Sequence, residues 1–315
     1  MDREGQKDNK EKKGKKKMKI THRNIKKRKR KFEYLICMAY YFGDPTDITT
    51  HDYDLARKKK IMLSTLKCLA NDPAMKNSLV VVYDDASPNK LSELEIFEQV
   101  TDRPAVYIQM EENTGCAEKE NIFNHISVKF AKYMVRMDDD VILNKSIKYT
   151  LDVMKKIKNC GVITINCGIL AYHSFWQNEK EYVDSKMIGN IWISPSKVFE
   201  DISYNDPTLG IFHDRDISYK MLYKGLRLLV ARKPVGYHTR SGANTTTELR
   251  RQKALEFAAK NPLVSITLNS RKNPICEYIP KKENFFQTGF KKIGPCERAI
   301  EIVAELEKLI FEEKK

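Results

Sequence analysis

Three consecutive carboxylates, Asp138, Asp139 and Asp140, stand between two short apolar segments of this sequence. Adjacent negative charges repel one another unless a cation neutralises them. Carboxylate oxygens suit Mg²⁺ or Mn²⁺, which leave their other positions to water or to the phosphates of a substrate. The triplet therefore indicates a divalent-metal site that could hold a diphosphate. The alternative is an acidic turn that ends a strand.

A second acidic pair, Asp84 and Asp85, follows the apolar run of residues 78–83. Both acidic groups come directly after predicted strands. The carboxyl ends of parallel strands meet at one edge of a sheet, where α/β folds bind their ligands. We therefore expect the pair to lie near the triplet. The alternative is that the pair caps the helix predicted near residue 91.

The elements that would position these groups alternate along the chain. Strands are predicted over 34–41, 78–83, 105–109, 134–137 and 162–165, and helices over 54–70, 91–100, 118–130 and 146–157. This alternation predicts an α/β fold with a mostly parallel sheet and helices on both faces. Beyond residue 166 we expect strands at 192–195 and 226–231, an extended piece at 235–238, helices at 214–222, 248–260 and 296–313, and a loop over 261–295.

The order of the polar motifs resembles that of GT-A fold glycosyltransferases, close to family 2. The motifs are Asp84-Asp85-Ala86-Ser87, Asn113-Thr114-Gly115, Arg136-Met137-Asp138-Asp139-Asp140, Gly189-Asn190-Ile191-Trp192, His213-Asp214 and His238. The resemblance covers roughly residues 33–240. It implies a Rossmann-like GT-A sheet and the transfer of a sugar from a UDP- or GDP-linked donor to an acceptor hydroxyl.

The resemblance also implies which residues bind the nucleotide-sugar. Asp84 and Asp85 would accept hydrogen bonds from the base and the ribose, and the glycine of the Asn113-x-Gly115 turn would let the backbone approach the ligand. Asp138 would hold the ribose or the sugar. The full donor-binding set is Ala39, Tyr40, Asp84, Asp85, Asn113, Gly115, Arg136, Asp138 and Asp139.

A metal site, a base and acceptor contacts follow from the same resemblance. Asp140 and His238 would bind Mn²⁺ or Mg²⁺, and an imidazole ligand favours Mn²⁺. Asp214 would be the general base of an inverting transfer. The family usually has Glu-Asp at this place, so His213 is a departure, and we assign His213 and Trp192 to the acceptor. The alternatives are that Asp214 caps a helix, that the histidines are structural and that Trp192 packs in the core.

The formal charge of +15 is concentrated at the amino terminus, because residues 1–31 carry +12. This segment has almost no apolar residues and is predicted to be disordered. The run Lys26–Lys31 would attract nucleic acid or another polyanion. The acceptor could then be a hydroxylated base in DNA, flipped out of the duplex. A merely solubilising tail is the alternative.

Cysteine usage and hydropathy bear on the compartment. The chain has seven cysteines and no Cys-x-x-Cys motif, which is typical of reduced thiols in a cytoplasmic protein. No apolar run approaches the roughly 18 residues of a membrane span.

We expect a basic tail at 1–31, a GT-A catalytic domain at 32–245 and a helical and loop extension at 246–315 packed on it. A nucleotidyltransferase and a catalytically inactive, GT-A-like nucleic-acid-binding protein stay open as alternatives.

Overall fold

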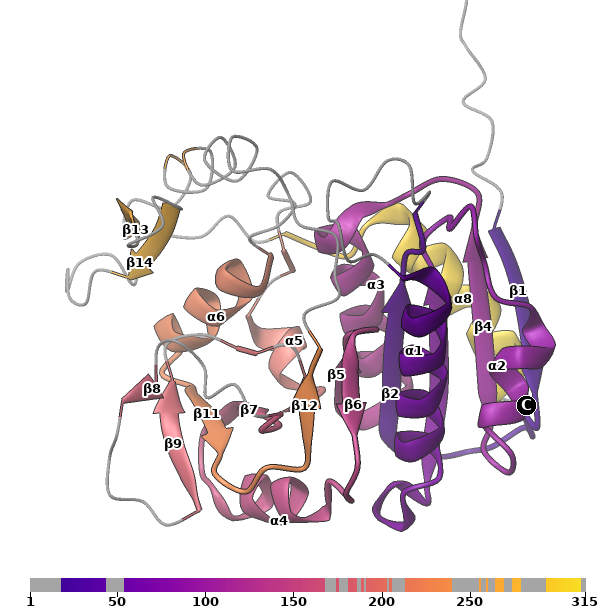
Figure 1. The fold of residues 1–315 in the computed structure, drawn as a ribbon, viewed down its shortest axis with the longest axis horizontal. Coiled ribbons are helices and arrows are strands. Elements are labelled where there is room, and N and C mark those ends of the chain that lie inside the picture. Colours follow the sequence, from indigo (N-terminus) through magenta and orange to yellow (C-terminus); the bar gives the residue numbers. More distant parts are fainter. Residues whose placement is uncertain are drawn as a thin grey trace, which may run out of the picture.

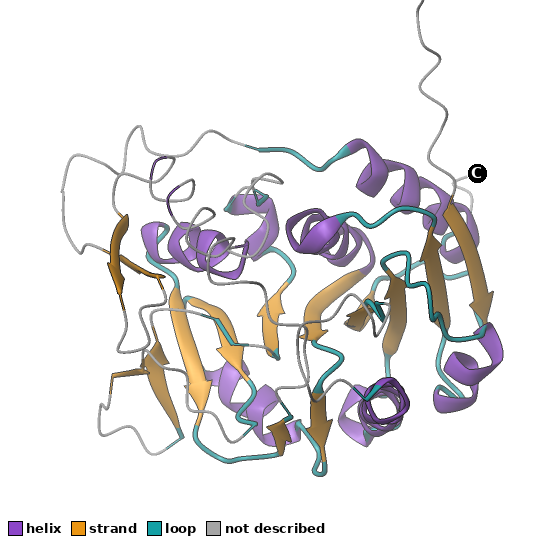
Figure 2. Ribbon diagram, turned by 45° about the horizontal axis from the view of Figure 1, so that its top comes forward, coloured by secondary structure: helices purple, strands orange, loops and turns teal. Residues whose placement is uncertain are grey.

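The protein has an α/β fold in which a large sheet lies between two layers of helices (Figures 1 and 2). The computed structural model describes residues 18–43, 54–167, 174–175, 181–185, 188–189, 191–202, 204–205, 213–239, 255, 259, 264–268, 274–278 and 293–312. The fold class predicted from the sequence is thus confirmed.

The main sheet has ten strands in the order β1-β4-β3-β2-β5-β10-β7-β11-β9-β8. Its centre is four parallel strands, β4 (Ala105–Met110), β3 (Ser78–Asp84), β2 (Phe32–Tyr40) and β5 (Ala131–Met137). The other strands are β1 (Met18–Arg23), β7 (Cys160–Thr164), β8 (Ser174–Phe175), β9 (Tyr182–Ser185), β10 (Trp192–Pro195) and β11 (Arg227–Ala231). β10 runs antiparallel to both β5 and β7, and β11 runs parallel to β7.

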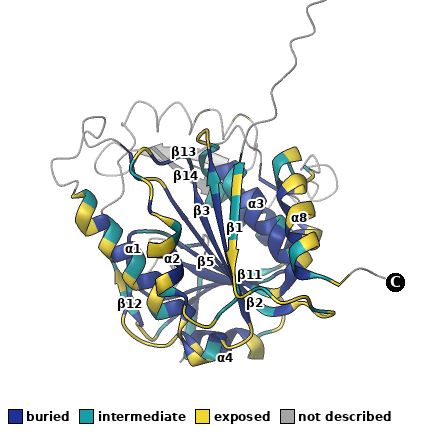
Figure 3. Cartoon of the chain, turned by 90° about the vertical axis from the view of Figure 1, so that its right-hand side faces the viewer, coloured by how far each residue is buried: buried dark blue, intermediate teal, exposed yellow. Residues whose placement is uncertain are grey.

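Helices cover both faces of this sheet. On one face lie α1 (Leu55–Ala70), the short 3₁₀ helix η2 (Pro73–Met75), α2 (Glu93–Gln99) and α4 (Lys148–Lys156), and on the other lie α3 (Gly115–Phe130), α5 (Val198–Asp201), α6 (His213–Tyr223) and α8 (Glu297–Ile310). Strand residues alternate between the two apolar layers, with Met38 packed on the first face and Cys37 on the second. Figure 3 shows the central strands as a buried layer, with exposed residues on the edge strand β1 and on the outer faces of the helices.

Two small sheets stand apart from the main one. β6 (Val141–Leu143) pairs antiparallel with β12 (Gly236–His238), beside the carboxyl end of β5 (Figure 1). β13 (Val264–Leu268) pairs antiparallel with β14 (Pro274–Tyr278). The prediction of a loop over residues 261–295 is therefore wrong for these two strands. Alternating apolar residues in 264–268 were the missed signal, which the surrounding Pro, Asn and Lys residues obscured.

The prediction that all of residues 1–31 are disordered is wrong for residues 18–31. β1 pairs antiparallel with β4 over six residue pairs, from Met18 opposite Met110 to Arg23 opposite Ala105. The backbone N–H of Arg28 then donates to the carbonyl of Ile310 at the end of α8, at 2.9 Å. The amino-acid composition of residues 18–31 did not predict this strand. An edge strand such as β4 offers backbone hydrogen bonds to a neighbouring segment whatever the side chains of that segment are. Residues 1–17 lie outside the described residues.

At the carboxyl end of the chain, α8 matches the helix predicted over 296–313 and packs against α3. The helix predicted over 248–260 lies almost wholly outside the described residues. Among the helices that the structure describes, none is long and apolar enough to cross a membrane.

Candidate active site

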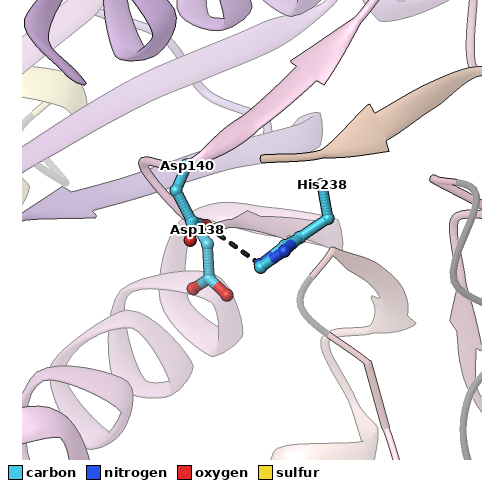
Figure 4. A group of neighbouring side chains, drawn as sticks. All are labelled: Asp138, Asp140 and His238. Atoms are coloured by element: carbon cyan, nitrogen blue, oxygen red, sulfur yellow. Dashed lines mark ion pairs between the residues drawn. The ribbon is translucent and has the colours of Figure 1, made fainter. Parts of the chain in front are cut away.

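Asp138, Asp140 and His238 converge at the carboxyl end of β5 (Figure 4). One ligand atom from each of the three lies within 4.8 Å of the other two. The Nε2 atom of His238 is 3.1 Å from Oδ1 of Asp140, and the two side chains are 13% and 10% exposed. Of the residues predicted to bind the metal, Asp140 and His238 are thus brought together, and Asp138 joins them.

These three side chains fit a divalent cation. Ligand atoms around an octahedral ion at roughly 2.1 Å lie about 3–4 Å apart, so the cluster needs only a small contraction to hold one. Two carboxylates and one imidazole suit Mn²⁺ better than Mg²⁺. Three protein ligands would leave about half of an octahedral shell for water or phosphate oxygens.

The β6–β12 pairing places His238 in this cluster. His238 lies opposite Val141, the residue that follows Asp140. A side chain at Gly236 would place its Cβ 2.1 Å from the carbonyl oxygen of Ile142, so only glycine allows the two strands this close approach. The N–H and Oγ1 of Thr239 both donate to the carbonyl of Asp140, at 2.9 and 2.7 Å. The backbone around the acidic triplet is therefore held from two sides.

Asp139 lies outside the metal cluster. Its Oδ2 atom is 3.3 Å from Nζ of Lys58 on α1, and the Asp139 side chain is 15% exposed. Burial raises the pKa of Asp139, while the Lys58 ammonium opposes that rise. The carboxylate thus ties the triplet to α1, and its predicted contact with the nucleotide-sugar stays a prediction.

A buried charged network extends from the metal cluster into the fold. The guanidinium of Arg136 pairs with Asp138, and its Nε donates to Oε1 of Glu120 on α3 at 2.5 Å. The same Glu120 oxygen is 3.9 Å from Nε2 of His213 on α6. The side chains of Arg136 and Glu120 are 7% and 3% exposed. The network therefore joins β5, α3 and α6 behind the acidic triplet.

Sequence reasoning missed Glu120. A signal was available, because Glu120 falls on the helical stripe of Ala117 and Asn124, which faces the interior. A carboxylate on the buried stripe of a helix requires a cationic partner. Arg136, on the neighbouring strand, was the candidate partner.

Asp214 lies in the first turn of α6, next to His213. Burial lowers the pKa of His213, and the carboxylates of Asp214 and Glu120 oppose that effect. One carboxylate oxygen of Asp214 accepts from the N–H of Arg215 at 2.9 Å, and the helix dipole stabilises a carboxylate in the first turn. Asp214 is thus connected to the metal cluster through His213, Glu120 and Arg136.

Asp84 and Asp85 are buried and occupied by internal hydrogen bonds, with 1% and 3% exposure. Asp84 accepts from the N–H of Ser87 at 2.8 Å and from the hydroxyl of Tyr107 at 3.4 Å, and burial raises its pKa. Asp85 accepts from the N–H and Oγ1 of Thr114, at 2.6 and 2.8 Å. The pair therefore shapes the turn after β3 and the start of α3. It does not cap α2, whose cap is Ser92.

Tyr40, Ala39 and Trp192, which were predicted to contact the donor or the acceptor, have buried side chains. Tyr40 is 1% exposed and its hydroxyl lies 2.6 Å from that of Tyr107. Ala39 is 5% exposed. Trp192 is 2% exposed, and its ring centroid lies 5.9 Å from that of Phe199. Strand alternation directs each of these side chains into an apolar layer, and their contacts with a base or an acceptor stay predictions.

The Asn113-Thr114-Gly115 turn has the backbone that the sequence suggested. Gly115 has a φ of +75°, and a Cβ built there would meet no atom within 4 Å. The side chain of Asn113 accepts from the N–H of Gly115 at 3.0 Å and donates to the carbonyl of Asp85 at 3.2 Å. The turn leaves open space in front of Gly115, as its predicted role in ligand binding requires.

No protein-family model matches the sequence, and no curated protein matches it. Among solved structures, the chain is similar to S. aureus TarS 1-349 in complex with UDP-GlcNAc, at 18% identity and a TM-score of 0.47, over 72% of this chain and 66% of that one. It is also similar to GalNAc-T7 with UDP, GalNAc and Mn²⁺, at 15% identity and a TM-score of 0.44, over 69% and 46% of the two chains. The match thus spans less than two thirds of each of these proteins. Because both TM-scores are below 0.5, the function proposed below rests on this chain's own residues.

Proposed function

We propose that this protein is a metal-dependent glycosyltransferase of the GT-A type, which transfers a sugar from a nucleotide-sugar to an acceptor hydroxyl. The observation that carries the proposal is the convergence of Asp138, Asp140 and His238 within 4.8 Å at the carboxyl end of a parallel sheet. His238 is remote in sequence from Asp138 and Asp140, and all three come from the motifs that resemble the family.

The residues divide into three groups by role. Asp138, Asp140 and His238 would hold Mn²⁺ or Mg²⁺, and a bound cation would stabilise the charge of the departing nucleoside diphosphate. Arg136 fixes the orientation of Asp138, since the guanidinium pairs with it and is anchored on Glu120. Asp214 would take the proton from the acceptor hydroxyl, which makes the reaction inverting.

The acceptor and the compartment are part of the same proposal. A hydroxylated base in DNA is one acceptor to test, beside polysaccharide, protein and small-molecule hydroxyls. The six cysteines whose side chains the structure describes are all free thiols, three of them buried. We propose that the protein works in the reducing environment of the cytoplasm.

The test is the binding and turnover of a panel of UDP- and GDP-sugars. We expect one donor to raise the melting temperature with Mn²⁺ present and to have little effect without it. Asp140→Asn should abolish this shift, whereas Asp152→Asn, an exposed aspartate on α4, should keep it. Asp214→Asn should still bind the donor but transfer the sugar about 10²–10⁴-fold more slowly. A donor-induced shift that is the same with and without Mn²⁺, and the same in Asp140→Asn as in the wild type, would refute the proposal.

A further inference from the structure

Residues 18–31 form a fixed array of positive charge on the folded body. They contain eight Lys or Arg residues and no Asp or Glu. β1 carries the first part of the array along the edge of the sheet. Residues 24–31, here called the basic edge, then lie at the amino ends of β4 and β2, since Arg23 is opposite Ala105 and β2 begins at Phe32.

The basic edge is held by contacts that leave much of its charge unneutralised. The Arg28 guanidinium lies 3.7 Å from the centroid of the Phe32 ring, and Nζ of Lys27 donates to the carbonyl of Lys308 at 2.7 Å. Among the described residues, carboxylates pair with Lys19 and Lys29, through Glu93 and Glu312, and with no other cation of the array. Six positive charges therefore stand close together without an acidic partner, which attracts anions.

The basic edge is concave. An open groove of about 570 Å³ is lined by Lys26, Lys27 and Arg28 together with Phe32, Asp102 and Pro104. Three cations and one carboxylate give the groove a net positive charge. Phe32 is only 3% exposed under the Arg28 guanidinium, so no aromatic face is free for a base to stack on.

We propose that the basic edge binds the phosphate backbone of a nucleic acid without preference for sequence. A concave groove lined by cations can follow a chain of phosphates, whereas the surface of a bilayer is flat and contacts such a groove poorly. Stable membrane docking needs apolar insertion or a second anchor beside the charges. The large apolar side chains that are exposed, Tyr41, Leu94, Tyr237, Leu255 and Ile300, all lie outside residues 24–31.

This surface is separate from the candidate active site. β2 runs from the basic edge at Phe32 to the site edge at Tyr40, over nine residues. At about 3.3 Å per residue the two edges are roughly 25–30 Å apart. Nucleic acid on the basic edge therefore leaves the donor site open, and the inference does not depend on the proposed function.

The experiment measures binding of a short fluorescent DNA oligonucleotide to the full chain by anisotropy, at several salt concentrations. The test variant is Lys26→Glu with Arg30→Glu, because both residues are exposed and have no ion pair among the described residues. The control variant, Lys60→Glu with Lys233→Glu, makes the same change of charge at exposed sites elsewhere. Residues 1–17 are kept in every protein, since they hold eight further Lys or Arg residues.

We expect the test variant to bind at least about tenfold more weakly and to lower the slope of log K against log salt by about 2, while the control stays within about twofold of the wild type. Scrambled oligonucleotide sequences should bind alike. If both variants lose the same affinity for DNA, the loss comes from the change in net charge and not from the basic edge. If the test variant binds DNA like the wild type, residues 1–17 are responsible for binding. Either result overturns the inference, as does capture by anionic vesicles of phosphatidylserine without binding of DNA. Binding of the sugar donor should be the same in all three proteins.

Discussion

The Nε2 atom of His238 lies 3.1 Å from Oδ1 of Asp140, and the pairing of β6 with β12 brings these two residues together. Asp140 directly precedes β6, and His238 ends β12. The contact therefore depends on the pairing of two three-residue strands that are remote in sequence. Metal affinity in this protein should therefore depend on that pairing as well as on the ligands themselves.

Removing a ligand should separate metal binding from folding. We expect Asp140→Asn to lower the affinity for Mn²⁺ by more than the roughly 10–100-fold that loss of an outer-shell group causes. The melting temperature without metal should not fall, because the substitution relieves repulsion among adjacent carboxylates. Calorimetric titration with Mn²⁺ and thermal unfolding check both parts. A variant that binds Mn²⁺ like the wild type would exclude Asp140 as a ligand.

Gly236→Ala tests the dependence on strand pairing without touching a ligand. The new Cβ would lie 2.1 Å from the carbonyl oxygen of Ile142, so β12 must move away from β6 and carry His238 with it. We expect roughly a 10–100-fold loss of Mn²⁺ affinity. Gly294→Ala is the matched control, since a Cβ there meets no atom within 4 Å. Equal Mn²⁺ affinity in the two variants would show that the β6–β12 spacing is not required.

The sequence predicted the central strands and the acidic groups at their ends because each has a strong local signal. Apolar runs such as 78–83 admit few interpretations other than a buried strand. The convergence of Asp140 and His238 came from the order of motifs, and no local pattern would have shown it. Such pairings join residues distant in the chain, and their register depends on contacts that a single segment does not encode.

Other site predictions depend on which way a side chain points. Tyr40 and Trp192 were assigned to a ligand through the family resemblance, whereas the period-two alternation of their strands turns both side chains into the core. Asp84 and Asp85 lie at the strand edge, where Asp84 accepts from the N–H of Ser87 and Asp85 from the N–H of Thr114. Hydrogen bonds from such backbone donors compete with ligand binding and are invisible in a motif.

Glu120→Ala should destabilise the fold strongly. The variant removes the buried carboxylate that pairs with the Arg136 guanidinium, which is 7% exposed, and leaves it only the more exposed Asp138. Breaking a buried pair in this way costs roughly 3–5 kcal/mol of unfolding free energy. Glu305→Ala is the control, because its pair with Lys308 is 51% and 69% exposed and should contribute below about 1 kcal/mol. Urea unfolding of both variants measures the difference, and similar losses would show that the buried network is not a stabilising unit.

Two partly buried histidines should make the protein less stable in mild acid. Burial lowers the pKa of His125 and of His213 below the ordinary value of 6.5. The unfolded chain therefore takes up protons first as the pH falls, and stability that is complete above pH 6.5 declines below it. Each histidine contributes a slope of up to about 1.4 kcal/mol per pH unit.

His125→Asn isolates one of these contributions at a distance from the acidic triplet. The wild-type ring lies 3.0 Å from the hydroxyl of Tyr204. Comparison of the variant with the wild type cancels the opposite slope that Asp84 and Asp139 contribute, since burial raises the pKa of both carboxyls. We expect a shallower loss of unfolding free energy below pH 6.5 in the variant, measured by urea unfolding. An unchanged slope would mean that His125 titrates alike in the folded and unfolded chains.

Removing residues 1–31 should destabilise the protein relative to removing residues 1–17 alone. The difference between the two truncations is β1 and the basic edge, which pair with β4 over six residue pairs and with the end of α8. We expect a lower melting temperature for the longer truncation, because each ladder hydrogen bond contributes roughly 0.5–1.5 kcal/mol net. The longer truncation also exposes the apolar edge of β4, so we expect concentration-dependent aggregation. Thermal unfolding compares the melting temperatures of the two truncated proteins, and light scattering compares their aggregation. Matching melting temperatures and scattering would mean that the sheet is complete without β1.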